Sequence, residues 1–347
     1  MIFIYNVLFI LLLGFFMKNN IETKKGKKIF LFITFFQMAL IQGLRSITVG
    51  TDTSLYVNTY NNYLFSEYYS FQFTHFEPIF KFIYEICHKF NFNSTHFLLL
   101  ISSITMFGFA YFIYKNSKNV IFSTFLFACL LYPNSFNIMR QYLALSISIN
   151  SYNFFADKKY FKGILLVLFS SFIHSTSILL LLLIPLNYLK KPKTKVLILI
   201  TLLPIFYLFG NYIVSNALIL VGKSFYASRY YVNRIFRLTT FITFLSFSLT
   251  ELFRKNCTDD KKEISLLSNI CFLNVFFGIL YLKYEYFSRV IELFNSFLII
   301  SIPLGMKYKF YLKPIIRVIV FIVPLLLMIN SIFNSGSGIE NYTFFFS

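Results

Sequence analysis

The residues best suited to chemistry stand in four short polar segments that are separated along the chain by apolar sequence. In order, they are Arg45-Ser-Ile-Thr-Val-Gly50-Thr-Asp52-Thr-Ser-Leu-Tyr56, His75-Phe-Glu77-Pro78, Phe136-Asn-Ile-Met-Arg140-Gln141 and His174-Ser-Thr-Ser. Each segment offers a guanidinium, a carboxylate or an imidazole. These are the groups with which proteins bind anions and transfer protons.

Arg140 and Gln141 lie in the first turns of a helix predicted to follow a tight turn at 132–137. Free backbone amides, the positive end of the helix dipole and a planar guanidinium meet at such a place, and together they suit a phosphate group. Pairing of Arg140 with Asp52, Glu77 or Glu85 is the alternative interpretation.

Three side chains are candidates for the proton acceptor in catalysis. Glu77 directly precedes Pro78, which suits the first turn of a helix. Its carboxylate either caps that helix or acts as a base, and in the second case partial desolvation would raise its pKa. His174 lies between two short apolar runs, where it either packs through a hydrogen bond or transfers protons. Asp52 is the third candidate, although Asp52 or Thr53 would also suit an N-cap.

Tyr56, Tyr60 and Tyr63 recur at helical spacing after Gly50, which permits a sharp turn. The stripe is typical of an aromatic belt at a membrane surface. Alternatively, it is a platform on which sugar rings stack, with Tyr56 among the substrate contacts.

The elements that position these residues must lie in lipid. The chain has 347 residues, of which 57% are hydrophobic and 13% charged, whereas a soluble domain has about 45–50% apolar and about 25% charged residues. This composition excludes a cytosolic enzyme, and long unbroken apolar runs exclude a porin-type barrel. We therefore predict an all-α polytopic membrane protein with ten to twelve transmembrane helices, formed as one transmembrane domain over 1–347.

Apolar runs between lysine clusters define the predicted spans. They are 1–17, 29–44, 96–114, 120–132, 136–155, 161–174, 176–189, 194–210, 238–253, 264–282, 286–306 and 314–333. This alternation places two longer segments outside the membrane, 45–95 and 211–237.

The net charge of +19 follows positive-inside topology and does not indicate a nucleic-acid partner. Twenty of the 24 lysines fall at the predicted inner face, but six of the eight arginines fall at the outer face, namely Arg45, Arg140, Arg229, Arg234, Arg237 and Arg289. Arginine matches phosphate with a planar fork, so the set predicts an anionic ligand at that face. Snorkelling to lipid headgroups, or ion pairs of Arg289 with Glu285 and Glu292, is the alternative.

Familiar cofactor and metal motifs are absent from the sequence. It contains no GxGxxG, P-loop, HExxH or outer DxD, and its four cysteines show no CxxC spacing. We therefore expect neither a cofactor nor a metal.

The ordered set Gly50-x-Asp52-x-x-x-Tyr56, Glu77-Pro78, Phe136-Asn-x-x-Arg140-Gln141-x-x-Ala144 and His174-Ser-x-Ser resembles the EpsG-like branch of the Wzy-type polysaccharide polymerases. The resemblance covers about residues 40–185. The histidine segment departs from the usual His-Lys-Ser-Ala. The resemblance implies a GT-C-like, metal-independent glycosyltransferase in the bacterial inner membrane.

Such an enzyme would polymerise undecaprenyl-diphosphate-linked oligosaccharide units into O antigen, capsule or exopolysaccharide, with a chain-length regulator as a further partner. The outer arginines would bind the diphosphate, and His174, Glu77 or Asp52 would accept the proton. Two alternatives remain: a flippase or exporter of the same glycolipid, and a membrane acyltransferase. A transporter should show repeats and midplane charges, and an acyltransferase an early intramembrane histidine.

Overall fold

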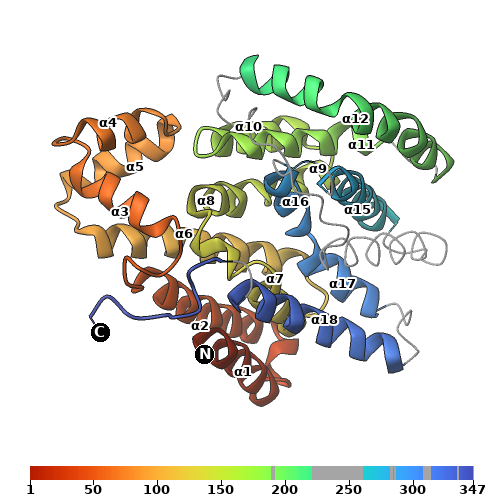
Figure 1. Cartoon of the computed structure of the whole chain (residues 1–347). Coiled ribbons are helices and arrows are strands. Elements are labelled where there is room, and N and C mark those ends of the chain that lie inside the picture. Colours follow the sequence, from red (N-terminus) through yellow and green to blue (C-terminus); the bar gives the residue numbers. More distant parts are fainter. Residues whose placement is uncertain are drawn as a thin grey trace. The chain divides into compact units, whose positions relative to one another are not determined.

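The computed structural model describes residues 1–188, 192–220, 261–281, 284, 287–307, 314–333 and 336–346. Within these ranges the regular elements are helices, and none is a β-strand (Figure 1). The chain divides into two compact units, formed by residues 1–180 with 311–347 and by residues 181–310. The all-α prediction is therefore confirmed for the described residues.

The first unit contains the four polar segments. Its helices are α1 (Ile2–Phe16), α2 (Lys24–Gly43), α3 (Thr53–Asn62), α4 (Glu67–Thr74), α5 (Pro78–Lys89), α6 (Ser94–Asn116), α7 (Val120–Leu130), α8 (Met139–Ser148), α9 (Ser151–Ala156), α10 (Tyr160–Ser171) and α18 (Pro314–Phe333), with 3₁₀ turns η1 (Asn20–Glu22) and η2 (Asn134–Phe136). Helix α6 packs against both α2 and α8, and α8 contacts α10. These contacts bring the end of α2, the start of α8 and the end of α10 into one unit.

The described part of the second unit contains five helices. It contains α11 (Leu183–Leu186), α12 (Pro192–Leu220), α15 (Lys261–Tyr281), α16 (Phe287–Asn295) and α17 (Leu298–Lys307), and η3 (Ser175–Leu182) leads into it along the chain. Helix α15 packs against α11, α12 and α16. Helix α12 extends to Leu220, into the segment 211–237 that was predicted to lie outside the membrane. Residues 221–237 of that segment lie outside the described part.

Side-chain caps explain where several helices begin. Thr23 accepts a hydrogen bond from the Gly26 amide at the start of α2, and Asn93 and Asn119 cap α6 and α7 in the same way. Each cap satisfies an amide that has no partner inside the helix. The predicted start of a helix at Pro78 is confirmed in α5.

The predicted span 136–155 is interrupted, and the expectation of one helix there is wrong. Its residues form the end of η2, then α8 and α9, with breaks at 137–138 and 149–150. At the second break the side-chain amide of Asn150 donates to the carbonyl oxygens of Ser146 and Gly108. The side chain thus replaces a backbone donor, as asparagine often does where a helix ends.

Only part of the predicted transmembrane pattern is visible in the helix lengths. Among the described residues, α6 is long and apolar enough to cross a membrane by itself, and α16 with α17 passes as a pair bent by 40°. Six further apolar helices are shorter, including α1, α7, α10 and α18. The count of ten to twelve spans therefore stays a prediction.

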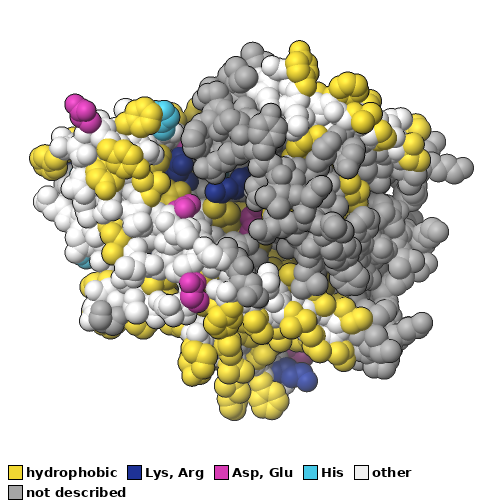
Figure 2. Space-filling view, in the orientation of Figure 1, with side chains coloured by type: hydrophobic (Ala, Val, Ile, Leu, Met, Phe, Trp, Pro, Cys, Tyr) yellow, Lys and Arg dark blue, Asp and Glu magenta, His cyan; other side chains and the backbone are white. Residues whose placement is uncertain are grey.

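Helices α1 and α18 nonetheless expose large apolar side chains. Figure 2 shows hydrophobic side chains gathered at the bottom of the view, where Figure 1 places α1 and α2. The exposed residues include Tyr5, Leu8, Leu12, Phe15 and Phe16 of α1 and Val318, Phe321, Ile322, Leu326, Ile329 and Phe333 of α18. Exposed apolar side chains that gather in this way are typical of an interface with lipid or protein.

Candidate active site around Glu77

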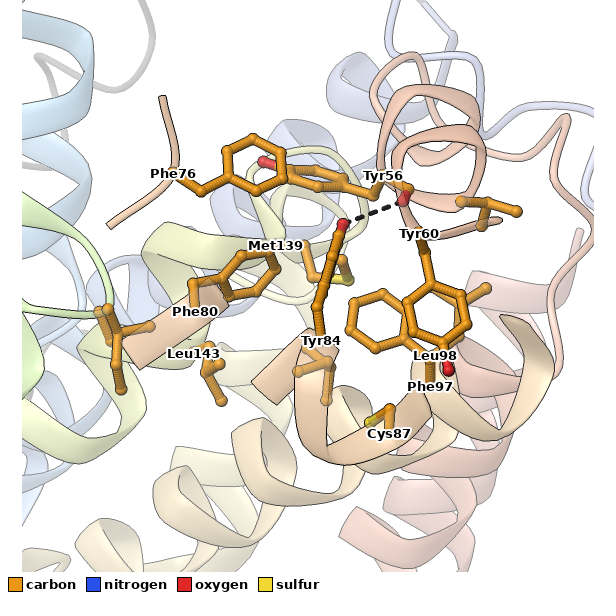
Figure 3. Close-up of a cluster of buried hydrophobic side chains, with 14 residues drawn as sticks. Tyr56, Tyr60, Phe76, Phe80, Tyr84, Cys87, Phe97, Leu98, Met139 and Leu143 are labelled. Atoms are coloured by element: carbon orange, nitrogen blue, oxygen red, sulfur yellow. Dashed lines mark hydrogen bonds between the residues drawn. The ribbon is translucent and has the colours of Figure 1, made fainter. Parts of the chain in front are cut away.

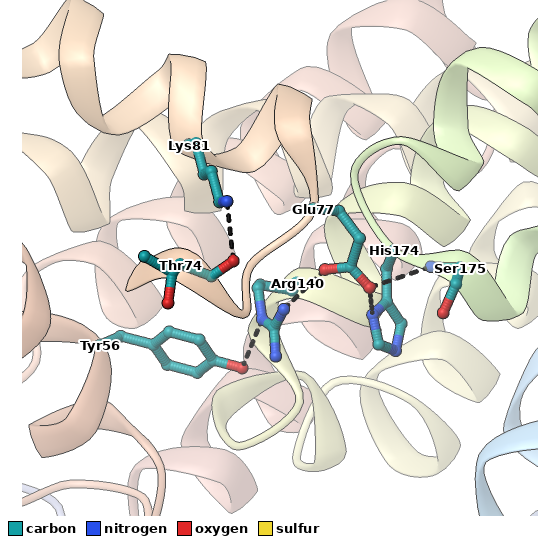
Figure 4. Close-up of polar contacts among 7 residues, drawn as sticks. All are labelled: Tyr56, Thr74, Glu77, Lys81, Arg140, His174 and Ser175. Atoms are coloured by element: carbon teal, nitrogen blue, oxygen red, sulfur yellow. Dashed lines mark hydrogen bonds and ion pairs between the residues drawn. The ribbon is translucent and has the colours of Figure 1, made fainter. Parts of the chain in front are cut away.

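Glu77 connects three segments that are distant in the sequence (Figure 4). It occupies the N-cap position of α5, yet its side chain makes no cap hydrogen bond. The carboxylate instead contacts Arg140 at the start of α8 and His174 after the end of α10. Of the two interpretations of Glu77, capping is therefore wrong.

Arg140 lies in the first turn of α8 and has a carboxylate on one side and aromatic rings around it. Its Nη1 donates to Glu77 Oε2 over 2.6 Å, and its Nε lies 3.5 Å from the Tyr56 hydroxyl. The guanidinium carbon lies 4.4 Å from the centre of the Phe76 ring and 5.8 Å from that of Phe80. The ion pair and the cation–π contacts hold a planar guanidinium in one orientation.

His174 is oriented by the other oxygen of the same carboxylate. Its Nδ1 lies 3.1 Å from Glu77 Oε1, which also accepts from the Ser175 amide over 3.3 Å. Because an ionised carboxylate only accepts hydrogen bonds, Nδ1 carries a proton. In the neutral ring, Nε2 then holds the lone pair that can accept a further proton.

The charge balance of the site keeps Glu77 ionised. Burial by itself would raise the pKa of Glu77, but the hydrogen bond with His174 and the positive charge of Arg140 outweigh it and lower the pKa to about 2. The expectation of a raised pKa for Glu77 is therefore wrong, because the two partners outweigh the effect of desolvation. A carboxylate with so low a pKa is a weak base near neutral pH, whereas it is well suited to orient a histidine.

The three side chains are mostly buried but remain accessible. The exposed fraction is 20% for Arg140 and 15% for both Glu77 and His174. The hydrogen bonds of Arg140 to Glu77 and Tyr56 use two of the five donors that a guanidinium carries. A ligand can therefore reach this cluster without the protein unfolding.

The predicted tyrosine stripe belongs largely to the core beside the site. The turn at Gly50, whose φ is +89°, and a short helix after it are as predicted, and Asp52 holds the N-cap position of α3 without a side-chain cap hydrogen bond. Tyr56 and Tyr60 are buried in a cluster with Phe80 and Tyr84, and the Tyr84 hydroxyl donates to the Tyr56 carbonyl (Figure 3). The interior face of α3 thus holds Tyr56 beneath Arg140.

The remaining predicted site residues lie elsewhere. Asp52 is partly exposed before α3 and forms no hydrogen bond or ion pair with Glu77, Arg140 or His174 among the described residues. Arg45 and Gln141 are buried, and Arg289 is exposed on α16 of the second unit. Arg229, Arg234 and Arg237 lie outside the described residues.

Sequence reasoning missed Phe76, whose ring lies nearest to the guanidinium of Arg140. Its position between His75 and Glu77 in a motif already singled out was the available signal. The described residues contain no group of three His, Cys, Asp or Glu side chains that could hold a metal ion.

The fold and the site define the class of protein. Its described residues form an all-helical fold with a partly buried Glu–Arg–His cluster. The chain belongs to the EpsG family, whose sequence model matches residues 28–345, and membrane association follows from the family match. This family is tied to polysaccharide biosynthesis. None of the curated proteins and none of the solved structures compared with the chain matches it.

Proposed function

We propose that this protein is a membrane glycosyltransferase that polymerises undecaprenyl-diphosphate-linked oligosaccharide units at the outer face of the bacterial inner membrane. One observation carries the proposal. Each of the four polar segments contributes one residue to the same cluster, namely Tyr56, Glu77, Arg140 and His174. The cluster combines a group that binds anions with a group that accepts protons, and both are needed to transfer a sugar from a diphosphate.

Arg140 would bind the diphosphate of the donor chain. Its planar fork can form paired hydrogen bonds with phosphate oxygens, and its partly exposed side chain lies against aromatic rings that exclude water. As the bond between the anomeric carbon and the diphosphate oxygen breaks, the electron pair goes to that oxygen. A guanidinium placed there stabilises the charge that develops, so the mechanism requires no metal.

His174 would be the general base. A hydroxyl of the acceptor sugar attacks the anomeric carbon, and its proton passes to Nε2 of His174. Glu77 holds the ring through Nδ1 and stabilises the imidazolium that results, as a carboxylate does in a catalytic triad. The low pKa of Glu77 favours this positioning role over direct proton transfer.

The reaction can be tested with purified protein and lipid-linked repeat units. Wild-type protein should convert single units into long chains and release undecaprenyl diphosphate, also in the presence of a chelator. If the chelator stops the reaction, the metal-free mechanism is wrong. If no chains form under any condition, the proposed function is wrong.

A gene deletion separates this enzyme from a flippase of the same glycolipid. Without a polymerase, single units should still reach the surface and appear there as chains of one unit on their normal acceptor. Loss of a flippase would leave the units on the cytoplasmic leaflet and remove the surface sugar altogether.

The multi-pass arrangement is part of the proposal and has its own test. Asn61 is exposed near the end of α3. We expect a cysteine placed there to react with a membrane-impermeant reagent added from outside. A cysteine at Lys115, which is exposed at the end of α6, should react only after the membrane is opened. Labelling of Lys115→Cys from outside would reverse the orientation and remove the site from the outer face.

A further inference from the structure

Arg45 is a buried cation that lies apart from the carboxylate of the site. It is 1% exposed, and no acidic side chain contacts it among the described residues. Burial lowers the pKa of Arg45 to about 10, so it stays protonated at neutral pH. A buried charge of this kind is costly unless hydrogen bonds satisfy it, so its contacts must be structurally important.

The guanidinium joins three elements through neutral acceptors. Nη1 donates to the Gln42 carbonyl at the end of α2 over 2.6 Å, and Nε donates to the Thr53 hydroxyl at the start of α3 over 3.1 Å. Nη2 donates to the Phe136 carbonyl at the end of η2, just before α8. Two of the three acceptors are carbonyls at helix ends, where the helix dipole favours a cation.

A segment distant in the sequence binds the same turns. We call residues 336–346 the strap. The Gly50 amide donates to the Gly338 carbonyl of the strap over 2.8 Å, and the Thr51 amide donates to the Ser337 carbonyl over 3.2 Å. The Asn137 side-chain amide donates to that same Ser337 carbonyl over 3.0 Å. One carbonyl of the strap therefore links the turn before α3 to the turn before α8.

Further bonds fasten the strap along the end of α2. The Ser46 amide donates to the Thr343 carbonyl, and the Phe345 amide donates to the Leu44 carbonyl. The Tyr342 hydroxyl donates to the Ile41 carbonyl over 2.6 Å. The strap is thus held at both ends by backbone groups of the segment that contains Arg45.

We propose that Arg45 and the strap act together as a positioning device for the site, and that Arg45 is not itself a ligand of the diphosphate. The device sets the start of α3, which carries Tyr56, against the start of α8, which carries Arg140. This inference rests on the proposed function, because it says how the anion-binding group of that reaction is held.

The chemistry of Arg45 fits a positioning role. Three acceptors from three elements surround one planar fork, and the side chain has almost no exposed surface for a ligand. Lysine has a single ammonium on a flexible stem and cannot hold all three acceptors in the same plane.

The test compares local hydrogen exchange with polymer formation in the full-length protein. Four substitutions are made: Arg45→Lys, Asn137→Ala and Tyr342→Phe, which each remove bonds of the device, and Tyr68→Phe as the control. Tyr68 lies on α4, outside the strap and the turns that the strap binds, and its side chain is 58% exposed. We expect the first three to speed exchange at the Gly50 and Thr51 amides at least tenfold and to lower the rate of chain formation. The control should do neither.

Two results would overturn the inference. In the first, Arg45→Lys lowers the rate while exchange at Gly50 and Thr51 stays at the wild-type value, which would make Arg45 a direct substrate ligand. In the second, the strap variants speed exchange tenfold while chain formation stays unchanged, which would make the device merely structural. If Arg45→Lys does not fold, Asn137→Ala and Tyr342→Phe still test the device, because faster exchange at Gly50 and Thr51 with unchanged chain formation would overturn it.

Failure of the proposed function gives a different result. Exchange in the variants would then change as expected, while the wild-type protein would form no chains from lipid-linked units. Transport or modification of the glycolipid would then be the activity to compare with hydrogen exchange.

Discussion

Arg45 and Arg140 lie in two regions of one unit and illustrate two uses of the same residue type. Arg140 has a carboxylate partner, stacks on Phe76 and keeps a fifth of its side chain exposed. Arg45 is enclosed by carbonyl and hydroxyl oxygens, with almost no exposed surface. Of the two guanidinium groups, only that of Arg140 keeps a surface that an anionic ligand could contact. The composition of the sequence and the spacing of its residues do not indicate which arginine donors are accessible.

The largest expected effect concerns His174, the second partner of Glu77. His174→Ala should lower the rate of chain formation by about 100- to 10,000-fold, because general base catalysis contributes that much. The measurement is the rate for purified protein with lipid-linked units. His96→Ala, an exposed histidine at the start of α6, is the matched control and should keep the wild-type rate. Equal losses in both variants would contradict the assignment of the base.

Arg140 should tolerate neither loss of its charge nor loss of its shape. Arg140→Ala and Arg140→Lys should each lower the rate by about 100-fold, because a single lost donor to a developing oxyanion costs about that much and lysine lacks the fork. Lys81→Ala removes a nearby cation that bonds to the Thr74 carbonyl, and it should change the rate little. Full activity of Arg140→Lys would reduce Arg140 to a point charge.

Acid should loosen the Glu77 cluster before it loosens the turns around Arg45. The folded state lowers the pKa of Glu77 from 4.5 to about 2, so the stability it contributes is present above pH 4.5 and is lost as the pH falls toward 2. The shift corresponds to about 3 kcal/mol. Glu77→Gln should remove this part of the pH dependence of the unfolding free energy.

Exchange at the Ser175 amide, which donates to Glu77, provides the local measurement. After correction for the intrinsic effect of pH, it should rise on acidification more than exchange at Thr51, whose acceptor is a neutral carbonyl. The opposite order would show that the cluster is not held by the ionised carboxylate.

The smallest expected effect separates two glycines with positive φ. Gly50 has φ +89°, and a methyl group there would lie 2.8 Å from the Asn137 side-chain oxygen, whereas Gly336 has φ +61° and open space. Gly336→Ala should cost about 1 kcal/mol of the unfolding free energy through backbone strain alone, and Gly50→Ala about 2 kcal/mol. Equal costs, measured by chemical denaturation, would show that Asn137 yields to the methyl group.

Several local features could be predicted because short-range chemistry determines them. The turn at Gly50, the start of α3 at Thr53 and the start of α5 at Pro78 all follow from residues next to one another in the chain. The same reasoning selected Glu77, Arg140 and His174 separately, each from its own segment. Pairing of Arg140 with Glu77 was one of three alternatives considered for that arginine.

Other features depend on contacts between segments that are far apart in sequence. The residues Glu77 and His174 are 97 positions apart, and Asn137 and Ser337 are 200 apart. Nothing local indicates that a carboxylate before Pro78 turns away from its own helix. Nor does any local feature indicate that a hydrogen bond with His174 and the charge of Arg140 outweigh the effect of burial on the pKa of Glu77. The break of the predicted span 136–155 likewise depends on the Asn150 amide reaching a carbonyl of α6.

The sequence by itself determined an apolar, helical chain, its turns and helix starts, and a short set of side chains able to bind anions and transfer protons. These properties depend on residue type and on neighbours within a few positions. Only the tertiary structure decided which of those side chains meet. It placed Arg140 and His174 on one carboxylate and enclosed Arg45 among carbonyl oxygens, because burial and partner choice depend on how distant segments pack.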